Sequence, residues 1–232
     1  MVAGSSTIFP ASSKNQIQQV EKIIKHPDQG VDLAILVLKK GFIFSKNVNK
    51  ISLKTRGHAQ GDLLWDCITY GWGKKSKNGV YELSGTKLTM TKLSNRTHCY
   101  KSHPKAREVL KKRLDLICGK TPEDFSICSG DFGGPLLCSY HIGTTFQIYF
   151  MGTAIKLTGD YDCRKNRKKE AVYEPMQDRL ELNFIGHMRW LKKTMDALQK
   201  PNVERSSSKM GQPISFLRAI LFSATIAAVI SE

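Results

Sequence analysis

Apolar positions recur at short intervals along most of the chain, a pattern typical of β-strands. Residues 31–38 form one brief apolar run, Val-Asp-Leu-Ala-Ile-Leu-Val-Leu, which is rich in β-forming side chains and too short to span a membrane as a helix. We expect further strands at residues 67–70, 83–93, 136–140 and 145–154, the last two forming a hairpin around Ile142-Gly143-Thr144. The pattern therefore predicts an all-β protein.

Two segments have the period of a helix instead. Within residues 106–116, Val109, Leu110 and Leu114 can share one face. Nearer the C-terminus, apolar residues recur at steps of three and four, which places them on one side of a helix: Ile185, Met188, Leu191, Met195 and Leu198. We expect a short internal helix and a second helix towards the C-terminus.

The composition describes a globular, strongly basic chain. It has 232 residues, 41% of them hydrophobic, and a formal net charge of +16, which predicts salt-sensitive attraction to anionic surfaces. The densest basic cluster has no interleaved aromatic residues and no nucleic-acid-binding motif, so sequence-specific nucleic-acid binding is not expected. It is interpreted as a solvated loop or as a surface for heparin-like polyanions or acidic membranes, and consists of Arg164, Lys165, Arg167, Lys168 and Lys169.

The cysteine content indicates an oxidising compartment. There are six cysteines, an even number that permits complete pairing. Because they contain no C-x-x-C motif and no histidine pair accompanies them at ligand spacing, neither a metal nor another cofactor is predicted.

The most informative stretch runs from Cys128 to Cys138 and contains Gly-Asp-Phe-Gly-Gly-Pro at residues 130–135. It resembles the G-D-S-G-G-P nucleophile loop of trypsin-like serine proteases, with Phe132 in place of the serine. In that family the glycines and the aspartate shape a turn whose N–H groups face the substrate carbonyl, and the serine hydroxyl attacks it. The alternative is a Gly-Gly-Pro turn between two cysteines of an unrelated disulfide-rich domain.

Other segments extend this resemblance over residues 1–199. Ile24-Lys25-His26-Pro27 and residues 31–36 are similar to the I-x-H-P segment and to the N-D-I-A-L-L strand, whose aspartate corresponds to Asp32. Residues 67–73 resemble C-x-x-x-G-W-G, residues 171–173 resemble G-V-Y, and residues 188–194 resemble the closing helix. The resemblance implies a trypsin-like double β-barrel followed by a C-terminal helix. It also implies three disulfides, Cys67–Cys138, Cys99–Cys118 and Cys128–Cys163.

Two family segments have no counterpart in the sequence. The R-I-V-G-G activation site and the A-x-H-C segment with the catalytic histidine are both absent, and residues 1–4 resemble the strand that follows that histidine. We therefore expect an incomplete N-terminal barrel with exposed strand edges, which a bound partner could fill. The histidines are expected to be loop or surface residues: His26, His58, His98, His103, His141 and His187.

The resemblance also identifies the remnants of an active site. Asp32 is interpreted as a relic of the catalytic triad that should protonate or turn towards water, and Asp131 as part of a loosely set, zymogen-like loop. The specificity pocket is expected to be degenerate at Ser126, Ile155, Leu157 and Ala171. The preferred interpretation is a catalytically inactive protease homologue that binds proteins or acts as a decoy. The alternatives are a hydrolase with a non-standard nucleophile such as Ser129, and a fragment that does not fold by itself.

The C-terminal region divides into a polar linker and an apolar tail. We assign the homology domain to residues 1–200, the linker to 201–213 and the tail to 214–230. The tail is interpreted as a GPI-attachment signal, a marginal membrane helix, or a loose or packed segment. Residues 1–20 lack the pattern of a signal peptide, whereas the family, the cysteines and the sequon at Asn95 favour an extracellular or cell-surface location.

Overall fold

The computed structural model describes the chain in separate ranges and is rich in strands. The described residues are 1–5, 15–52, 66–72, 84–90, 107–113, 116–120, 130–142, 145–156, 170–175, 187–199, 219–223 and 226–231. Their elements are β1 (Val2–Ala3), β2 (Gln16–Ile17), β3 (Val20–Lys25), β4 (Ala34–Leu38), β5 (Ile51–Ser52), β6 (Asp66–Gly71), β7 (Ser84–Met90), α2 (Arg107–Lys112), β8 (Ile117–Lys120), β9 (Pro135–Ile142), β10 (Thr145–Ala154), β11 (Glu170–Pro175), α3 (Met188–Gln199), β12 (Ala219–Ser223) and β13 (Ile226–Ser231). The strands and both helices expected from the sequence are therefore present.

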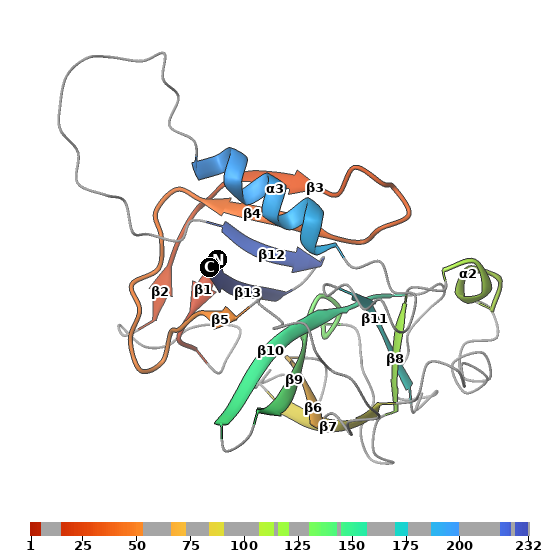
Figure 1. The fold of residues 1–232 in the computed structure, drawn as a ribbon. Helices are drawn as coiled ribbons and strands as arrows, with labels where there is room; N and C mark the ends of the chain where they lie inside the picture. Colours follow the sequence, from red (N-terminus) through yellow and green to blue (C-terminus); the bar gives the residue numbers. More distant parts are fainter. Residues whose placement is uncertain are drawn as a thin grey trace, which may run out of the picture.

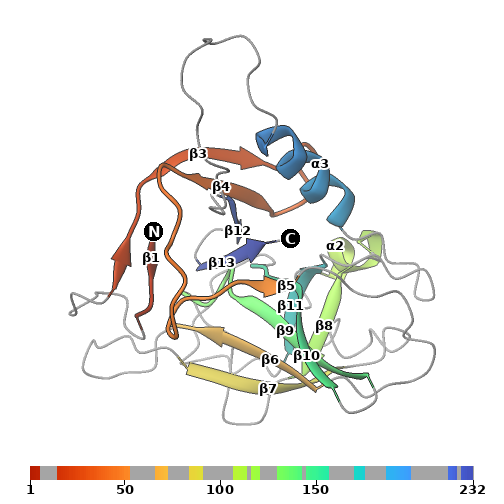
Figure 2. The ribbon, with the colours of Figure 1, turned by 60° about the vertical axis from the view of Figure 1, so that its left-hand side comes forward.

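Six strands close into a barrel. They follow the order β11-β8-β7-β6-β9-β10, and an additional pairing of β10 with β11 joins the two ends. Every neighbouring pair in this ring is antiparallel, including the predicted hairpin of β9 and β10. Figure 2 shows these six strands together in the lower half of the molecule. Because the ring is closed, each of these six strands has a hydrogen-bonded neighbour on both sides.

The other half of the sheet stays open. From β10 the hydrogen-bonded order continues β5-β13-β12-β4-β3, and β1 and β2 form a separate two-stranded sheet. In Figure 1, α3 lies beside β3 and β4. One closed and one open barrel half is the incomplete trypsin-like architecture that the resemblance implies.

Strand β4 is apolar along its whole length because it is covered on both faces. Ile35 packs with Phe150 of β10 and with Leu191 of α3 in one core cluster. Leu36 and Leu38 belong to a second cluster with Phe42 and Val48. Burial on both faces explains why this strand is a continuous apolar run instead of alternating with polar residues.

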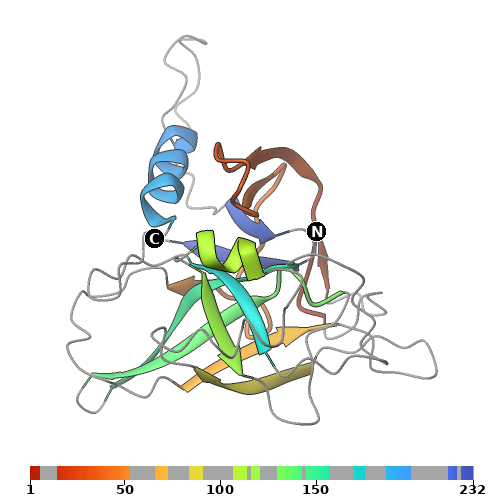
Figure 3. The same ribbon diagram turned by 90° about the vertical axis from the view of Figure 1, so that its right-hand side faces the viewer.

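Helix α2 is shorter than the segment with helical period. Leu110 packs with Leu116, Cys118, Ile155 and Val172, so the helix covers part of the closed barrel, as Figure 3 shows beside β8 and β11. The chain leaves the helix after Lys112 and enters β8 at Ile117, which allows Leu116 to join the same cluster.

The structure places the described part of the apolar tail in the sheet. Residues 219–223 and 226–231 form an antiparallel hairpin, β12–β13, between β4 and β5. In the described ranges, no helix combines the length and the apolar character needed to cross a membrane. The three interpretations of the tail stay predictions. Strand β4 has no free edge, because β12 pairs with one side of it and β3 with the other, whereas β3 ends the order of the described strands.

Candidate functional site

The loop at residues 130–134 is a tight turn that leads directly into β9. The N–H of Gly134 donates to the carbonyl oxygen of Asp131 (2.9 Å), and Gly130 and Gly133 have φ angles of 104° and 86°. Glycine suits these two positions because other residues are strained at such angles. The N–H of Gly133 donates to the carbonyl oxygen of Ala154 (2.7 Å), which ties the loop to the end of β10.

Phe132 and Asp131 are both buried in this loop. Phe132 is only 7% exposed and Asp131 only 8%. Asp131 lies directly over Gly71, since a Cβ atom built at that glycine would be 2.0 Å from Oδ1 of the aspartate. Burial raises the pKa of Tyr173, and the nearby charge of Asp131 raises it further. The loop therefore carries an apolar ring where the family has its nucleophile, above a closely packed carboxylate.

Asp32 comes just before β4 and its side chain is exposed. Partial desolvation raises the pKa of its carboxyl group, and the negative charge of Glu174 raises it further. The interpretation of Asp32 as a relic of the triad stays a prediction. The charge that acts on Asp32 is that of a second carboxylate, whereas a triad aspartate orients an imidazole.

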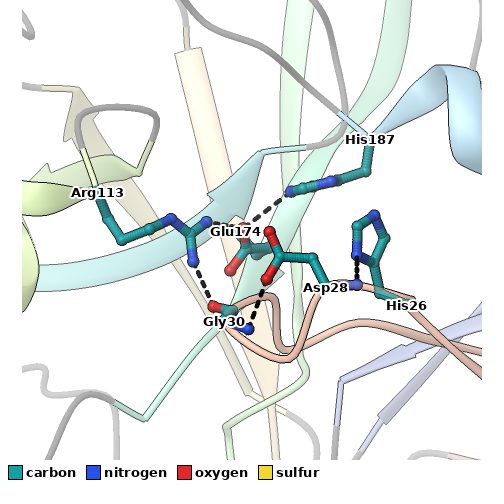
Figure 4. A network of polar contacts seen from close by, with 6 residues as sticks. All are labelled: His26, Asp28, Gly30, Arg113, Glu174 and His187. Atoms are coloured by element: carbon teal, nitrogen blue, oxygen red, sulfur yellow. Dashed lines mark hydrogen bonds and ion pairs between the residues drawn. The ribbon is translucent and has the colours of Figure 1, made fainter.

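Figure 4 shows a polar network around Glu174, which we call the Glu174 cluster: His26, Asp28, Gly30, Arg113, Glu174 and His187. Glu174, on β11, is 0% exposed. Nε2 of His187 lies 2.9 Å from its Oε1, and the Arg113 guanidinium donates to that same oxygen and to the carbonyl oxygen of Gly30. Oε2 of Glu174 has no hydrogen-bond partner among the residues that the structure describes. The cluster joins β11, the chain after α2, the loop before β4 and the start of α3.

His26 forms the outer part of the cluster. Its Nδ1 accepts a hydrogen bond from the N–H of Asp28 (3.2 Å), and its ring packs edge-on against the rings of His187 and Trp190, each at 4.7 Å between centroids. Desolvation lowers the pKa of His26, and the neighbouring His187 lowers it further.

The sequence did not reveal this cluster. His187 lies in a bend just before α3, which fits the prediction of a loop residue, but its side chain is only 10% exposed and contacts a fully buried carboxylate. An acidic residue directly after Ala171-Val172-Tyr173, the segment that resembles G-V-Y, was the available signal, because a buried charge needs partners.

The predicted pocket positions are only partly described. Ile155 is buried in the apolar cluster beneath α2, and Ala171 lies in β11 opposite Gly119. Ser126 and Leu157 lie outside the described residues, as do Ser129, Asn95 and the basic cluster at 164–169. In the part of the chain that is described, no group of three or more His, Cys, Asp or Glu side chains could hold a metal ion.

A disulfide joins two neighbouring strands of the closed barrel. Cys67 of β6 and Cys138 of β9 are register partners and are bonded to each other. This is one of the pairings that the resemblance implies. Cys118 is disulfide-bonded as well, while Cys99, Cys128 and Cys163 lie outside the described ranges.

Comparison with known proteins agrees with this architecture. The sequence profile of the Trypsin family matches residues 1–179, so the chain belongs to the trypsin family of serine proteases and their homologues. It is 25% identical over 209 residues to mouse (Mus musculus) kallikrein 1-related peptidase b8, a match that covers 83% of this chain and 70% of that protein. It is 23% identical over 200 residues to human (Homo sapiens) serine protease 1, covering 84% and 70%.

A further relative is much longer than this chain. Rat (Rattus norvegicus) transmembrane protease serine 9 is 28% identical over 138 residues, which are 57% of this chain but 12% of the rat protein. The match of residues 1–179 to the Trypsin profile establishes the family.

Proposed function

We propose that this chain is a non-catalytic member of the trypsin family that binds another protein, as a binding partner or as a decoy. The single observation that carries the proposal is the buried phenyl ring of Phe132 in the loop where relatives place the serine. A phenyl ring has no lone pair to attack a carbonyl, and loss of the triad serine alone costs on the order of a millionfold in turnover.

The surroundings of Asp32 support the same conclusion. A working triad needs an imidazole between the aspartate and the nucleophile. Here Glu174 is the charge that raises the pKa of Asp32, and His187 contacts Glu174 at 2.9 Å. His26 accepts a hydrogen bond from the N–H of Asp28, so both of these imidazoles have structural contacts of their own.

Exposed apolar side chains in and near the β1–β2 sheet offer candidate binding positions, which we call the β1–β2 patch: Val2, Ile17, Ile43 and Phe44. Ile17 and Ile43 are each 68% exposed and Phe44 is 43% exposed. Val2 is the register partner of Ile17, and the Gln16 side-chain amide both accepts from the N–H and donates to the carbonyl oxygen of Ile43, each at 2.7 Å. Clustered exposed apolar side chains are typical of protein-interaction surfaces.

Charge indicates the kind of partner. The net charge of +16 and the exposed Lys46 and Lys50, which follow the patch in sequence, favour an acidic protein. The basic cluster at 164–169 would add binding to polyanions or acidic membranes. An extracellular or cell-surface location is consistent with the disulfides.

The first experiment tests catalysis. The purified chain is incubated with a fluorophosphonate probe and with a broad peptide library, beside active trypsin as the positive control. We expect neither labelling nor cleavage above background. Labelling of any serine would reject the proposal and favour the alternative hydrolase, and loss of labelling in Ser129→Ala would identify Ser129 as its nucleophile.

The second experiment tests binding. Partners captured from extracellular fluid by the wild-type chain are compared with those captured by Ile43→Asp and by the matched control Leu198→Asp, which changes an exposed residue of α3. We expect Ile43→Asp to lose acidic partners that the control retains. Equal capture by both variants would reject the β1–β2 patch as the binding face. A cooperative melting curve for all three proteins excludes the interpretation as a non-folding fragment.

A further inference from the structure

The hairpin β12–β13 occupies a specific place in the sheet. On one side, β12 pairs with β4 through four register partners, from Ala219 opposite Val37 to Phe222 opposite Ala34. On the other side, β13 pairs in parallel with β5 through Ile230 opposite Ile51 and Ser231 opposite Ser52. The hairpin thus lies between two strands that are far from it in sequence.

This hairpin also connects the two parts of the hydrogen-bonded sheet. Among the described strands, β3 and β4 are connected to β5, and through it to the closed barrel, by β12 and β13. Without the hairpin, the hydrogen-bonded sheet would separate into the β3–β4 pair and the closed barrel with β5. The apolar contacts of Leu33 and Ile35 with Phe150 would remain, but the ladder between the two halves would not.

Exposing the edge of β4 that the hairpin covers would be energetically unfavourable. All side chains of Ile35 to Leu38 are buried, and β3 pairs with only one edge of β4. An apolar strand with a free edge presents a row of unpaired N–H and C=O groups and is a template for aggregation. Pairing with β12 satisfies those groups within the same chain.

We infer that residues 219–231 act as an internal strand donor that links β4 to β5 and so joins the open half of the sheet to the closed barrel, and that they are retained for this purpose in the folded protein. An apolar segment satisfies its backbone either as a helix in lipid or by pairing in a sheet. Here the pairing partners are present on both sides of the hairpin. The tail is therefore part of the fold and not a membrane anchor or a removable lipid-attachment signal. This inference does not depend on the proposed protein-binding function.

The test uses residues 1–232 in hydrogen–deuterium exchange with mass spectrometry. We expect protection of 219–223 together with 34–38, at a level independent of protein concentration. Exchange of 219–231 at the rate of an unstructured peptide would overturn the inference. Protection that appears only on dimerisation would also overturn it, because the donor would then belong to a second copy.

A pair of proline variants separates a strand donor from an anchor. Leu221→Pro removes an N–H from β12, whereas the control Val203→Pro lies in the preceding polar segment. We expect Leu221→Pro, but not Val203→Pro, to increase exchange at 34–38 at least tenfold and to lower the melting temperature. Unchanged exchange at 34–38 in Leu221→Pro would overturn the inference. A mature protein from cells that ends before Ala219 by mass spectrometry would overturn it too.

Discussion

Oε1 of Glu174 lies 2.9 Å from Nε2 of His187, the residue immediately before α3. The same oxygen accepts a hydrogen bond from Arg113, which follows α2. A carboxylate that is fully buried in β11 therefore fixes the starting point of one helix and the end of another. In this protein the loop before Asp32 is held by these contacts, since Arg113 also donates to Gly30.

Replacing Glu174 by alanine should strongly destabilise the fold. The change leaves Arg113 and His187 without their common acceptor in a buried site, and breaking a buried ion pair in this way costs about 3–5 kcal/mol. Glu174→Gln keeps the shape and one acceptor oxygen, so it should cost less. Denaturant unfolding measures both values. A loss below about 1 kcal/mol for Glu174→Ala would show that the cluster does not hold these elements together.

Gly71→Ala should displace the Asp131 loop. The added Cβ would be 2.0 Å from Oδ1, 2.7 Å from Cγ and 3.0 Å from Cβ of Asp131, so the aspartate must move. Overpacking of this kind costs roughly 1–3 kcal/mol. The matched control is Gly30→Ala, whose nearest new contact is Oδ1 of Asp28 at 3.3 Å. Thermal melting should separate the two variants clearly, and equal melting temperatures would contradict the close packing of Asp131 on Gly71.

The closed barrel could be predicted from the sequence because its signals are local. The segment Pro135–Ala154 contains two apolar runs around a glycine, and it folds as the expected hairpin of β9 and β10. The Cys67–Gly73 resemblance located β6 and its disulfide with Cys138 in the same way. Strand β4 was recognisable because burial on both faces leaves an unbroken apolar run.

The Glu174 cluster and the tail could not be predicted in this way. Arg113 and Glu174 are 61 residues apart, so no local spacing in the sequence indicates that they form an ion pair. The apolar stretch 214–230 satisfies the composition of a lipid-embedded helix and that of a buried hairpin equally well. The pairing of β12 with β4 has no local signal either, because it joins residues more than 180 positions apart, from Ala34 to Phe222.

Phe132→Ser should not create a protease. The substitution restores the family's loop sequence, but the new hydroxyl would still lack a general base, because Asp32 is influenced by Glu174 and His187 contacts that same residue. Fluorophosphonate labelling should stay at background. Phe132→Ala serves as the control for lost packing, which costs about 3–5 kcal/mol at a buried phenylalanine. Labelling of a folded Phe132→Ser protein would mean that a functional base is present.

His26 should make the protein less stable in mild acid. Desolvation and then His187 lower its pKa below the ordinary value of 6.5, so the folded state binds this proton less readily than the unfolded state does. The contribution of His26 to the stability of the folded state is therefore complete above pH 6.5, and it is lost as the pH falls through the lowered pKa of His26 in the folded state. In an NMR titration, His26 should titrate below its ordinary range. His187→Gln removes the second cause, so the pKa of His26 should rise towards 6.5 in that variant while remaining lowered by burial. An unchanged pKa in His187→Gln would show that the edge-on contact between the two imidazoles carries no electrostatic coupling.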